Sequence, residues 1–390
     1  MDTPFLRRVT LKNYRSIAAC RVDLGPLMFL VGRNGAGKSN FLDALRFVAD
    51  ALNNSLDHAL RERGSLNEVR RRSGGHPTHF AIRLDFQLPE GSHGHYAFSV
   101  GSKSGGTYEV QEEECWIGES NFHVRSGEVE KASFGPVPAT LPDRLFLVAA
   151  SGLPAFRPVF DALSRIEVYN LNPRSIAAMQ RPDRGDKLRR DGSNAASVLQ
   201  KLTPEAHERI KEYLSRIVPG VSDVGTKVLG SQETIEFRQS VRGLEHPWRF
   251  LAASMSDGTL RAFGILLAIF QTGGKPPPLI GLEEPEVALH PAAANVLLSA
   301  LREGSRHSQV LVTSHSPDLL DNPDIPVDSL LAVENSDGLT QINAIDQAGW
   351  DALMEGLFTA GELLRLNQLA QPSDAAIDPK TLRIFGRSKP

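Results

Sequence analysis

The sequence contains little cysteine and no long apolar run. Cys20 and Cys115 are its only cysteines among 390 residues, and their wide separation predicts neither a disulfide framework nor a zinc site. No apolar run reaches the roughly 18 residues of a membrane-spanning helix. Residues 1–17 are charged and lack the apolar stretch of a secretion signal. We therefore expect buried or incidental thiols in a cytoplasmic protein with no membrane partner.

An excess of one charge and a sustained heptad repeat are also missing. The net charge is -3, with 23% charged and 41% hydrophobic residues, which excludes a uniformly basic nucleic-acid binder and a disordered chain. The apolar stripe within residues 203–217 is too short for a coiled coil. The composition is that of a globular protein, and the length allows two or three domains.

The most specific pattern present is a glycine-rich loop between a predicted strand and a predicted helix. The run LVGRNGAGKSNF contains the pattern GxxxxGK[ST] and follows the apolar residues 27–31. Its glycines let backbone N–H groups converge on a phosphate, Lys38 adds an ammonium, and the Ser39 hydroxyl is placed for Mg²⁺. The predicted nucleotide-binding residues are Gly32, Arg33, Asn34, Gly35, Ala36, Gly37, Lys38, Ser39 and Asn40.

Paired acids follow a second short apolar strand, at residues 279–282. A carboxylate at the end of a strand beside a phosphate loop can hold a metal ion or activate water. We assign Glu283 to the metal and Glu284 to the water. The next apolar strand ends in TSHSP, which predicts a catalytic role for His315 as a hydrogen-bond donor to phosphate or as a polarising group for water.

The remaining pattern alternates between strands and helices. Residues 5–24 and 80–124 predict antiparallel strands, with Gln87 at one strand end as a candidate nucleotide-sensing glutamine. We expect the helix after the glycine-rich loop to continue to about Leu60 with an interruption near Asn53. Residues 146–220 predict an inserted helical lobe, after which strands return.

The segment SDGT, at residues 256–259, predicts a serine-capped apolar helix. Nearer the end of the chain we expect a hairpin at residues 336–338, a helix near residues 350–369 and a mobile tail from Gln371.

Arginines cluster in a glycine-broken segment after the first helix, and two interpretations stay open. The segment is either a solvated loop or a contact surface for a phosphate backbone. Its members are Arg61, Arg63, Arg70, Arg71 and Arg72.

Four motifs stand in a fixed order: GRNGAGKS, SMSDGT, LIGLEEPE and TSHSP. Together they resemble the ABC-type ATPase heads, within the branch that contains RecF, SMC-like proteins and the OLD-family ATPases, often described as predicted AAA-21 ATPases. The opening LKNYRSI is similar to that branch, and GLFTAGELLRLNQL is similar to the ending of a stand-alone group within it. The resemblance implies an α/β fold, an ABC-ATPase head with a mixed central sheet, an antiparallel β subdomain and an inserted helical lobe.

The resemblance also implies cofactors, partners and domains. ATP and Mg²⁺ are the expected cofactors, and Glu283 matches the usual Walker B aspartate. Ser256, Asp257 and Gly258 match the signature loop, which in this family caps the nucleotide of the opposite subunit, so a homodimer is expected and a higher oligomer stays open. The expected segments are an N-terminal core part at 1–145, the lobe at 146–240, a C-terminal core part at 241–370 and a tail at 371–390.

Several motifs of this sequence differ from those of the family, and these differences disfavour a transporter subunit and an OLD-type nuclease. The signature reads MSDGT where transporters have LSGGQ, glutamate replaces the Walker B aspartate, and the Q-loop is indistinct. No CxxC hook is present. OLD nucleases carry a C-terminal Toprim domain, and the residues after the predicted hairpin are too few to form one. We therefore expect any nuclease to be a separate chain.

Three functions follow as alternatives. The leading hypothesis is a dimeric switch ATPase in which hydrolysis controls a partner effector or nuclease, or changes how the ATPase itself binds DNA. A role in prokaryotic antiphage defence is part of this hypothesis, and it rests on family analogy. A second is RecF-like loading onto duplex DNA through the arginines. A third is a scaffold that binds ATP in order to sequester a toxic partner. A transporter subunit is the least favoured.

Overall fold

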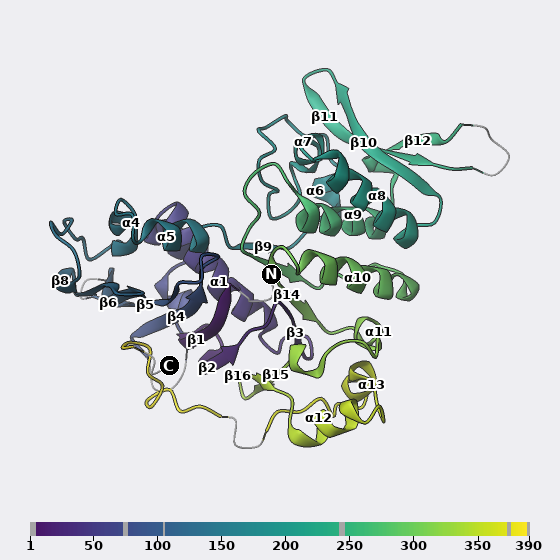
Figure 1. Ribbon diagram of the computed structural model, residues 1–390. Coiled ribbons are helices and arrows are strands. Elements are labelled where there is room, and N and C mark those ends of the chain that lie inside the picture. The colour runs from purple at the N-terminus through teal and green to yellow at the C-terminus, as the bar shows by residue number, and fades with distance from the viewer. Residues whose placement is uncertain (1–4, 73–76, 104–105, 242–245, 373–375, 388–390) are drawn as a thin grey trace. The chain divides into compact units, whose positions relative to one another are not determined.

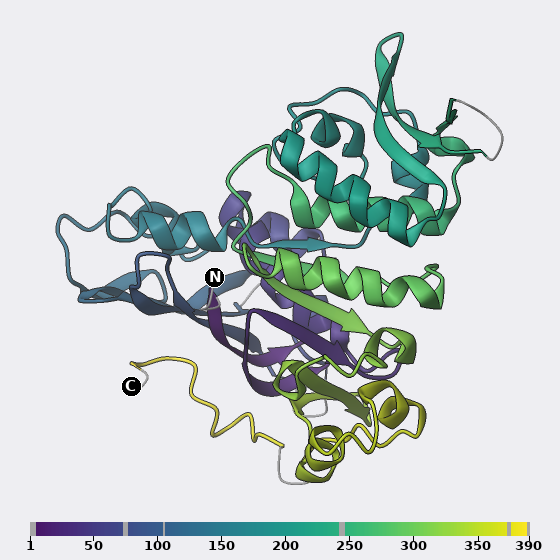
Figure 2. The same cartoon turned by 45° about the vertical axis from the view of Figure 1, so that its right-hand side comes forward.

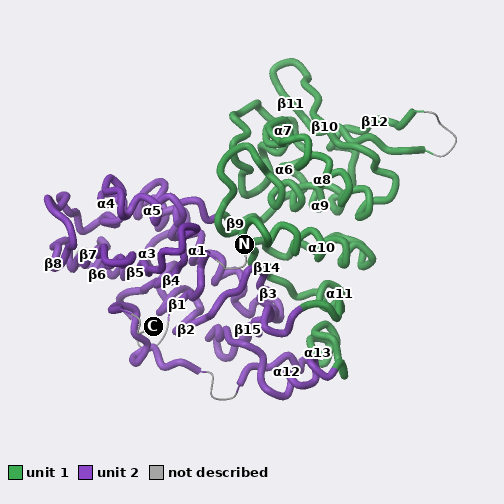
Figure 3. The backbone as a smooth tube through the Cα atoms, viewed as in Figure 1, with its two compact units in different colours: residues 1, 167–325, 356–366 green, residues 2–166, 326–355, 367–390 purple. Residues whose placement is uncertain are grey.

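The protein divides into two compact units, each built from separate stretches of the chain (Figure 3). Unit 1 comprises residues 167–325 and 356–366, and unit 2 comprises residues 2–166, 326–355 and 367–390. The structure, a computed structural model, describes residues 5–72, 77–103, 106–241, 246–372 and 376–387. The four consecutive segments expected from the sequence do not coincide with these interleaved units, and they stay a prediction.

Unit 2 is organised around a large mixed sheet (Figure 1). Its strands lie in the order β8-β7-β6-β5-β4-β1-β2-β16-β15-β3. Neighbours from β8 to β2 are antiparallel, whereas β16 pairs with β2, and β15 with β3, in parallel. The bounds are β1 (Leu6–Tyr14), β2 (Ile17–Asp23), β3 (Leu27–Val31), β4 (His79–Gln87), β5 (His93–Ser102), β6 (Tyr108–Ile117), β7 (Ser120–Arg125), β8 (Glu128–Ala132), β15 (Leu330–Ser336) and β16 (Leu339–Ala344).

The hairpin of β15 and β16 separates two strands that are neighbours in the sequence. β2 ends at Asp23 and β3 begins at Leu27, yet β16 and β15 lie between them in the sheet. Asp337 and Gly338 turn the hairpin with φ values of 53° and 77°, which confirms the predicted turn. A strand from near the end of the chain thus pairs with the strand that precedes the glycine-rich loop.

Helix α1 packs on this sheet through an aromatic cluster. The Phe47 ring meets Phe80 edge-on at 5.3 Å between centroids and lies 6.4 Å from Phe98. α1 ends at Asn53 and α2 follows from Leu56, so the predicted interruption is confirmed. The helices of unit 2 are α1 (Lys38–Asn53), α2 (Leu56–Arg61), α3 (Leu66–Val69), α4 (Phe146–Ala150), α5 (Arg157–Leu163) and α12 (Gln347–Met354), with the 3₁₀ helix η3 (Val327–Ser329).

Unit 1 contains short parallel strands and a separate small antiparallel sheet. The parallel strands are β9 (Glu167–Tyr169), β13 (Leu279–Glu283) and β14 (Gln309–Ser314), in the order β14-β13-β9. The antiparallel strands, in chain order, are β10 (Val221–Leu229), β11 (Gln232–Gln239) and β12 (Trp248–Leu251). The mixed sheet of unit 2, the small antiparallel sheet of unit 1 and the helices within each unit confirm the predicted fold class.

Four helices of unit 1, α6, α7, α8 and α10, pack around α9. From Leu260 to Ile269 every side chain of α9 except that of Arg261 is buried, as expected of an apolar helix. Phe263 meets Phe237 of the small sheet at 5.7 Å, and Figure 2 shows that sheet beside the helices. The helices are α6 (Pro173–Ala177), α7 (Ala195–Gln200), α8 (Pro204–Ile217), α9 (Asp257–Phe270), α10 (Ala294–Gly304), α11 (Pro317–Leu320) and α13 (Ala360–Arg365), with the 3₁₀ helices η1 (Ala252–Ser254) and η2 (Pro291–Ala293). Of the described helices in either unit, none combines the length and the apolar character needed to cross a bilayer.

The arginine-rich segment is not a simple solvated loop. α2 and α3 run through it, and the Arg63 side chain is 3% exposed and pairs with Asp43 and Asp50. Arg70 donates from Nη1 to Ser102 Oγ at 2.9 Å. The interpretation as a solvated loop was therefore wrong for Arg63, because its buried guanidinium pairs with two carboxylates of α1, the partly buried Asp43 and the buried Asp50.

The predicted helix near residues 350–369 is two short helices. α12 ends at Met354, and Gly356 then adopts a φ of 68°, which a continuing helix cannot contain. α13 ends at Arg365, before Asn367 at a φ of 57°. The expectation of one helix was wrong, because apolar spacing alone does not reveal a glycine used in the left-handed region.

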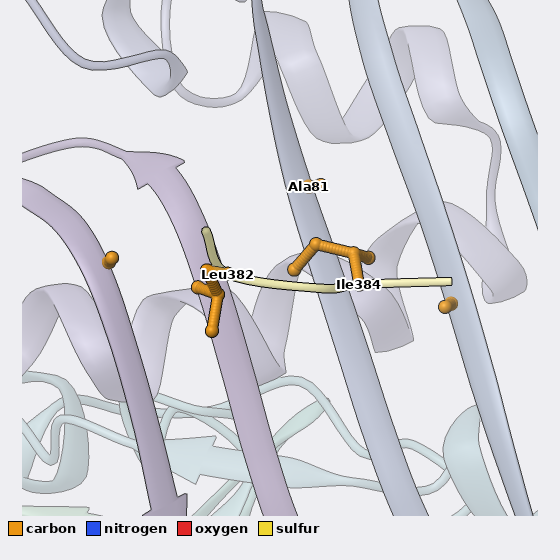
Figure 4. Close-up of a cluster of buried hydrophobic side chains, with 5 residues drawn as sticks. Ala81, Leu382 and Ile384 are labelled. Atoms are coloured by element: carbon orange, nitrogen blue, oxygen red, sulfur yellow. The ribbon is translucent and has the colours of Figure 1, made fainter. Parts of the chain in front are cut away.

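The tail that was expected to be mobile packs against the sheet of unit 2. Leu382 and Ile384 are buried against Ala19, Ala81 and Ala97, whose small side chains leave room for them (Figure 4). Arg83 donates from Nη1 to the carbonyl oxygens of residues 384 and 386, at 2.9 and 2.8 Å. The prediction was wrong for residues 376–387, and residues 373–375 and 388–390 lie outside the described part of the chain.

Candidate functional site

The glycine-rich loop connects β3 to α1, and the β15–β16 hairpin packs against it. Gly35 and Gly37 have φ values of +79° and +103°, which residues with side chains rarely adopt. A Cβ at Gly32 would overlap the Val333 carbonyl oxygen, and one at Gly37 would overlap the Thr340 side chain. Around Gly35 the space is open. The loop therefore needs glycine at these positions, for backbone conformation, for close approach or for both.

Lys38 is buried beneath the loop. Its Nζ donates to the carbonyl oxygens of Gly32 and Arg33 at 2.8 and 3.0 Å, and the residue is 4% exposed. Arg33, Asn34 and Ser39 are exposed, and Ala36 is buried. The loop thus encloses one positive charge and presents the Ser39 hydroxyl to solvent.

A chain of polar side chains fixes the loop from below. Thr340 Oγ1 donates to the Ala36 carbonyl oxygen at 2.8 Å and lies 2.7 Å from Ser16 Oγ, to which Asn40 donates at 2.6 Å. The predicted ligand Asn40 therefore directs its amide to Ser16, within the protein. Sequence reasoning missed the role of Thr340, and its only signal for Ser16 was the motif LKNYRSI.

These residues fit a triphosphate with its magnesium ion. α1 starts at Lys38, its N-cap Gly37 has no side chain to cover the first N–H groups, and its first turn has no acidic residue. A helix N-terminus of this kind binds phosphate. Among the described residues no three His, Cys, Asp or Glu are arranged to hold a metal ion, but nucleotide-bound Mg²⁺ needs only one or two protein ligands besides phosphate oxygens.

In unit 1 the acidic strand and the histidine strand end side by side. β13 and β14 are parallel neighbours, with Glu283 opposite Thr313. His315 Nδ1 lies 3.1 Å from Glu284 Oε1, and the two side chains are 35% and 34% exposed. The structure thus brings together the three residues predicted for hydrolysis, Glu283, Glu284 and His315. The side chains of Glu284 and His315 are partly exposed, whereas the His315 Nδ1 atom that faces Glu284 is buried.

Glu284 has a strained backbone. Its φ is +44°, in the left-handed region, which costs an ordinary residue about 1 kcal/mol. Its N–H donates to the carbonyl oxygen of Thr313 at 3.0 Å and lies 3.2 Å from Thr313 Oγ1, so the neighbouring strand holds the conformation in place. Conformations of this kind cluster at functional sites, where they aim a side chain that a relaxed backbone would direct elsewhere.

A buried acid that sequence reasoning missed anchors the histidine loop. Ser314 Oγ donates to Glu286 Oε1 at 2.6 Å and accepts from the Ser316 N–H at 3.0 Å. Burial raises the pKa of Glu286, although the bond from Ser314 opposes the shift. The only signal in the sequence was a third acid in LIGLEEPE.

Two further residues that sequence reasoning missed contact Glu283. Asn170, which follows β9, lies with Nδ2 3.4 Å from Glu283 Oε2, and Arg261 of α9 lies with Nη2 3.4 Å from the Glu283 carbonyl oxygen. Burial lowers the pKa of Arg261, whereas Glu286, Glu284 and Glu283 oppose that shift. Arg261 therefore supplies positive charge to a site that would otherwise concentrate carboxylates. Asn170 had one signal, a polar residue after a short apolar strand, and Arg261 had none.

The signature residues begin α9 as predicted. Ser256 Oγ caps the helix by accepting from the Thr259 N–H at 3.2 Å, and Asp257 is exposed in the first turn. A Cβ at Gly258 would overlap the Ala288 carbonyl oxygen, so the start of α9 lies against the chain that follows Glu284. Gln87 is the last residue of β4, and its sensing role stays a prediction.

Two family descriptions match parts of the chain. Residues 159–321 match the family described as "AAA domain, putative AbiEii toxin, Type IV TA system". Residues 5–90 match the family described as "AAA ATPase domain". The second match contains the glycine-rich loop, and the first contains the acidic strand and the histidine. No curated protein sequence matches the chain significantly.

Solved structures of SMC head domains share the fold. One is an SMC head bound to the C-terminal winged-helix domain of ScpA, with 15% identity and a TM-score of 0.56 over 89% of this chain and 100% of that chain. Another is the Pyrococcus furiosus SMC head with an extended coiled coil, bound to the C-terminal domain of ScpA, with 13% identity and a TM-score of 0.56 over 91% and 100%. At these identities the likeness describes the fold alone.

Proposed function

We propose that this chain, an ABC-type ATPase of the SMC and RecF-like branch, hydrolyses ATP in a homodimer and uses the reaction as a switch. The observation that carries the proposal is the pair of Glu284 and His315. The two side chains lie 3.1 Å apart at the ends of adjacent parallel strands, and Glu284 has a backbone conformation that only its neighbours stabilise. A surface ion pair would not require such strain.

The phosphate loop supplies binding in this proposal. Its backbone N–H groups, the N-terminus of α1 and Lys38 hold the phosphate oxygens. Ser39 and Glu283 are the metal ligands, and Mg²⁺, when bound, neutralises charge on the transferred phosphoryl group. Arg33 and Asn34 are exposed on the loop and line the approach to it.

Glu284 is the general base. Its carboxylate takes a proton from water as the water oxygen bonds to the γ-phosphorus, while the bond between that phosphorus and the leaving oxygen breaks to release ADP. His315 orients the carboxylate through the 3.1 Å contact and donates towards phosphate oxygen. Glu286 and Ser314 hold the histidine loop and are positioning residues.

The switch requires a second copy of the chain. Ser256, Asp257 and Gly258 present a capped and exposed helix start, which completes a nucleotide site on an opposing subunit. ATP then favours the dimer and hydrolysis releases it. A separate effector or nuclease chain binds differently to the dimer and to the separated subunits. The mention of toxin–antitoxin systems in one matched family description supports a partner of that kind. Antiphage defence belongs to the same proposal, and it rests on family analogy.

The experiment measures phosphate release and oligomeric mass for wild type, Glu284→Gln and Lys38→Ala, each with and without Mg-ATP. Wild type is expected to hydrolyse ATP and to assemble transiently. Glu284→Gln is expected to lose at least about 100-fold in turnover and to stay assembled, because it binds ATP but lacks the base. Lys38→Ala is expected neither to hydrolyse ATP nor to assemble, because it lacks the ammonium that holds the phosphates.

A static scaffold gives a different result. In that case Glu284→Gln assembles as wild type does, and wild type releases no phosphate above background. Equal masses in every condition, together with no hydrolysis, would remove the switch from consideration.

A further inference from the structure

The function proposed above gives no role to the segment GLFTAGELLRLNQL. Its residues 356–366, which include α13, belong to unit 1, although the chain on both sides of them belongs to unit 2. The chain thus leaves unit 2 for eleven residues and then returns. A short excursion of this kind needs a specific contact to hold it, because so few residues bury little apolar surface.

That contact is a set of charged and polar bonds to α11. Arg365 reaches both carboxylate oxygens of Asp321, at 3.1 Å from Nη1 and 2.6 Å from Nη2, and Nη2 also lies 3.2 Å from Asp318 Oδ1. Thr359 Oγ1 donates to Asp321 Oδ1 at 2.8 Å. A bidentate arginine pair fixes orientation as well as distance.

α13 also approaches α11 closely through its backbone. A Cβ at Gly361 would overlap the Pro317 carbonyl oxygen and the Asp321 carboxylate. The neighbouring Ala360 and Leu363 are buried. The start of α13 therefore packs directly on the first turn of α11, and Figure 1 shows the two helices side by side.

α11 begins two residues after His315. On the strand side of the histidine, Ser314 is fixed by Glu286, and on the other side the chain enters α11 at Pro317. The histidine loop is thus held at both ends, by a buried acid at one end and by α13 at the other. A shift of α11 would move His315 relative to Glu284.

We propose that α13 is a positioning element for His315, with Arg365, Thr359 and Gly361 as its positioning residues. These residues hold α11 so that the imidazole stays within reach of Glu284. The inference rests on the proposed hydrolytic function. It predicts that α13 affects the rate of turnover and does not affect nucleotide binding. A displacement of about 1 Å at a reacting group can cost a factor of ten to a hundred in rate.

The first test compares ATP turnover of Arg365→Ala and Gly361→Ala with wild type. Both variants are expected to lose about tenfold or more in kcat, with a KM for ATP within about twofold of wild type, because the phosphate loop is untouched. Arg365→Lys is expected to have a kcat between those of Arg365→Ala and wild type, since lysine keeps the charge but cannot form the bidentate pair.

Arg209→Ala is the matched control. Arg209 pairs with Glu303 between α8 and α10, at 2.7 Å from Nε, and its side chain is 42% exposed against 46% for Arg365. Loss of this ion pair is expected to leave kcat and KM unchanged. Thermal unfolding of every variant separates a positioning effect from a general loss of structure.

The second test does not depend on activity. In protein labelled with ¹⁵N-histidine, the ring resonances of His315 are identified by their absence from His315→Gln. They are expected to shift in Arg365→Ala and Gly361→Ala and to stay in place in Arg209→Ala.

The outcomes are distinguishable. If wild type hydrolyses ATP while Arg365→Ala keeps the wild-type kcat and the wild-type His315 resonances, the positioning role is overturned and the hydrolytic function stands. If wild type hydrolyses no ATP, both the function and this inference fall. A loss of turnover in Arg209→Ala equal to that in Arg365→Ala would also overturn the inference, because it would reflect a general weakening of unit 1.

Discussion

At the scale of single residues, Gly35 and Gly37 form a matched pair. Both have positive φ values, so alanine at either position costs about 1 kcal/mol in backbone strain. Only at Gly37 would the new methyl group also overlap Thr340, whereas at Gly35 it meets open space. We expect Gly37→Ala to weaken ATP binding at least tenfold more than Gly35→Ala does, a difference of about 1.4 kcal/mol or more. Titration calorimetry with Mg-ATP measures it, and equal losses would contradict the steric role of Thr340.

Glu113 predicts a pH dependence of stability. Its buried carboxylate accepts from the N–H groups of Phe146 and Leu147, at 2.6 and 2.8 Å, and from the Tyr96 hydroxyl at 2.9 Å. Burial raises its pKa from 4.5 to about 7, although these bonds oppose the shift. The folded protein therefore binds this proton more tightly than the unfolded chain. Its contribution to stability is complete below about pH 4.5 and is lost as pH rises through about 7.

The test compares urea unfolding of wild type and Glu113→Gln at pH 5 and pH 8. The variant carries no titrating group at this position and serves as the reference. The free energy of unfolding of wild type relative to the variant is expected to fall between the two pH values, by up to about 3 kcal/mol. Parallel pH profiles would show that Glu113 stays charged throughout.

Some residues of the candidate site could be predicted and others could not. Glu283, Glu284 and His315 follow apolar strands, and that local pattern was enough to propose them. Thr340 and Glu286 could not be found in this way, because their roles depend on contacts with residues far away in the sequence, the glycine-rich loop and Ser314 respectively. The strain at Glu284 is likewise invisible in a sequence.

At the scale of secondary-structure elements, an ion pair of the buried Arg63 joins α1 to the residues that follow α2. The Arg63 guanidinium bonds both Asp43 oxygens at 3.0 Å and lies 5.1 Å from the centre of the Phe47 ring. Arg63→Ala is expected to lower the free energy of unfolding by about 1.5–3 kcal/mol, because Asp43 and Asp50 lose a buried charged partner, although Asp43 keeps Arg15 and Asp50 keeps Arg46. Arg72→Ala is the control: that side chain is 72% exposed, and its loss should cost less than about 1 kcal/mol. Similar small values for both, by denaturant unfolding, would contradict the structural role of Arg63.

Elements with strong local periodicity were predicted well, and weak ones were not. The helix from Pro204 to Ile217 buries the apolar stripe that the sequence indicates, and the Thr203 side chain caps its first turn. β8 was missed because it is an edge strand with one apolar residue apart from its terminal alanine, Val129. The split between α12 and α13 was missed because only the left-handed Gly356 marks it.

At the scale of the whole molecule, the tail ties the end of the described chain to strands formed by its first hundred residues. Leu382 and Ile384 point to the sheet while Arg383 between them is exposed. Ile384→Ala is expected to cost about 2–4 kcal/mol of stability, as deletion of buried methyl groups does elsewhere. Arg383→Ala should change stability by less than about 0.5 kcal/mol. Thermal unfolding of the full chain distinguishes the two, and equal values would mean that the tail does not stay on the sheet.

The place of the β15–β16 hairpin in the sheet has a consequence for the order in which the protein can fold on the ribosome. β2 and β3 emerge early, but the strands that fill the space between them are translated about 300 residues later. At roughly 5–20 residues per second the nascent chain waits about 15–60 s with that gap open. Residues 167–325 are contiguous and complete within this interval. This part of unit 1 can therefore fold while the phosphate loop still lacks Thr340 and Val333, whereas residues 356–366 complete unit 1 only after the hairpin has been translated. During this interval chaperones have their longest access to the unfinished edges of β2 and β3.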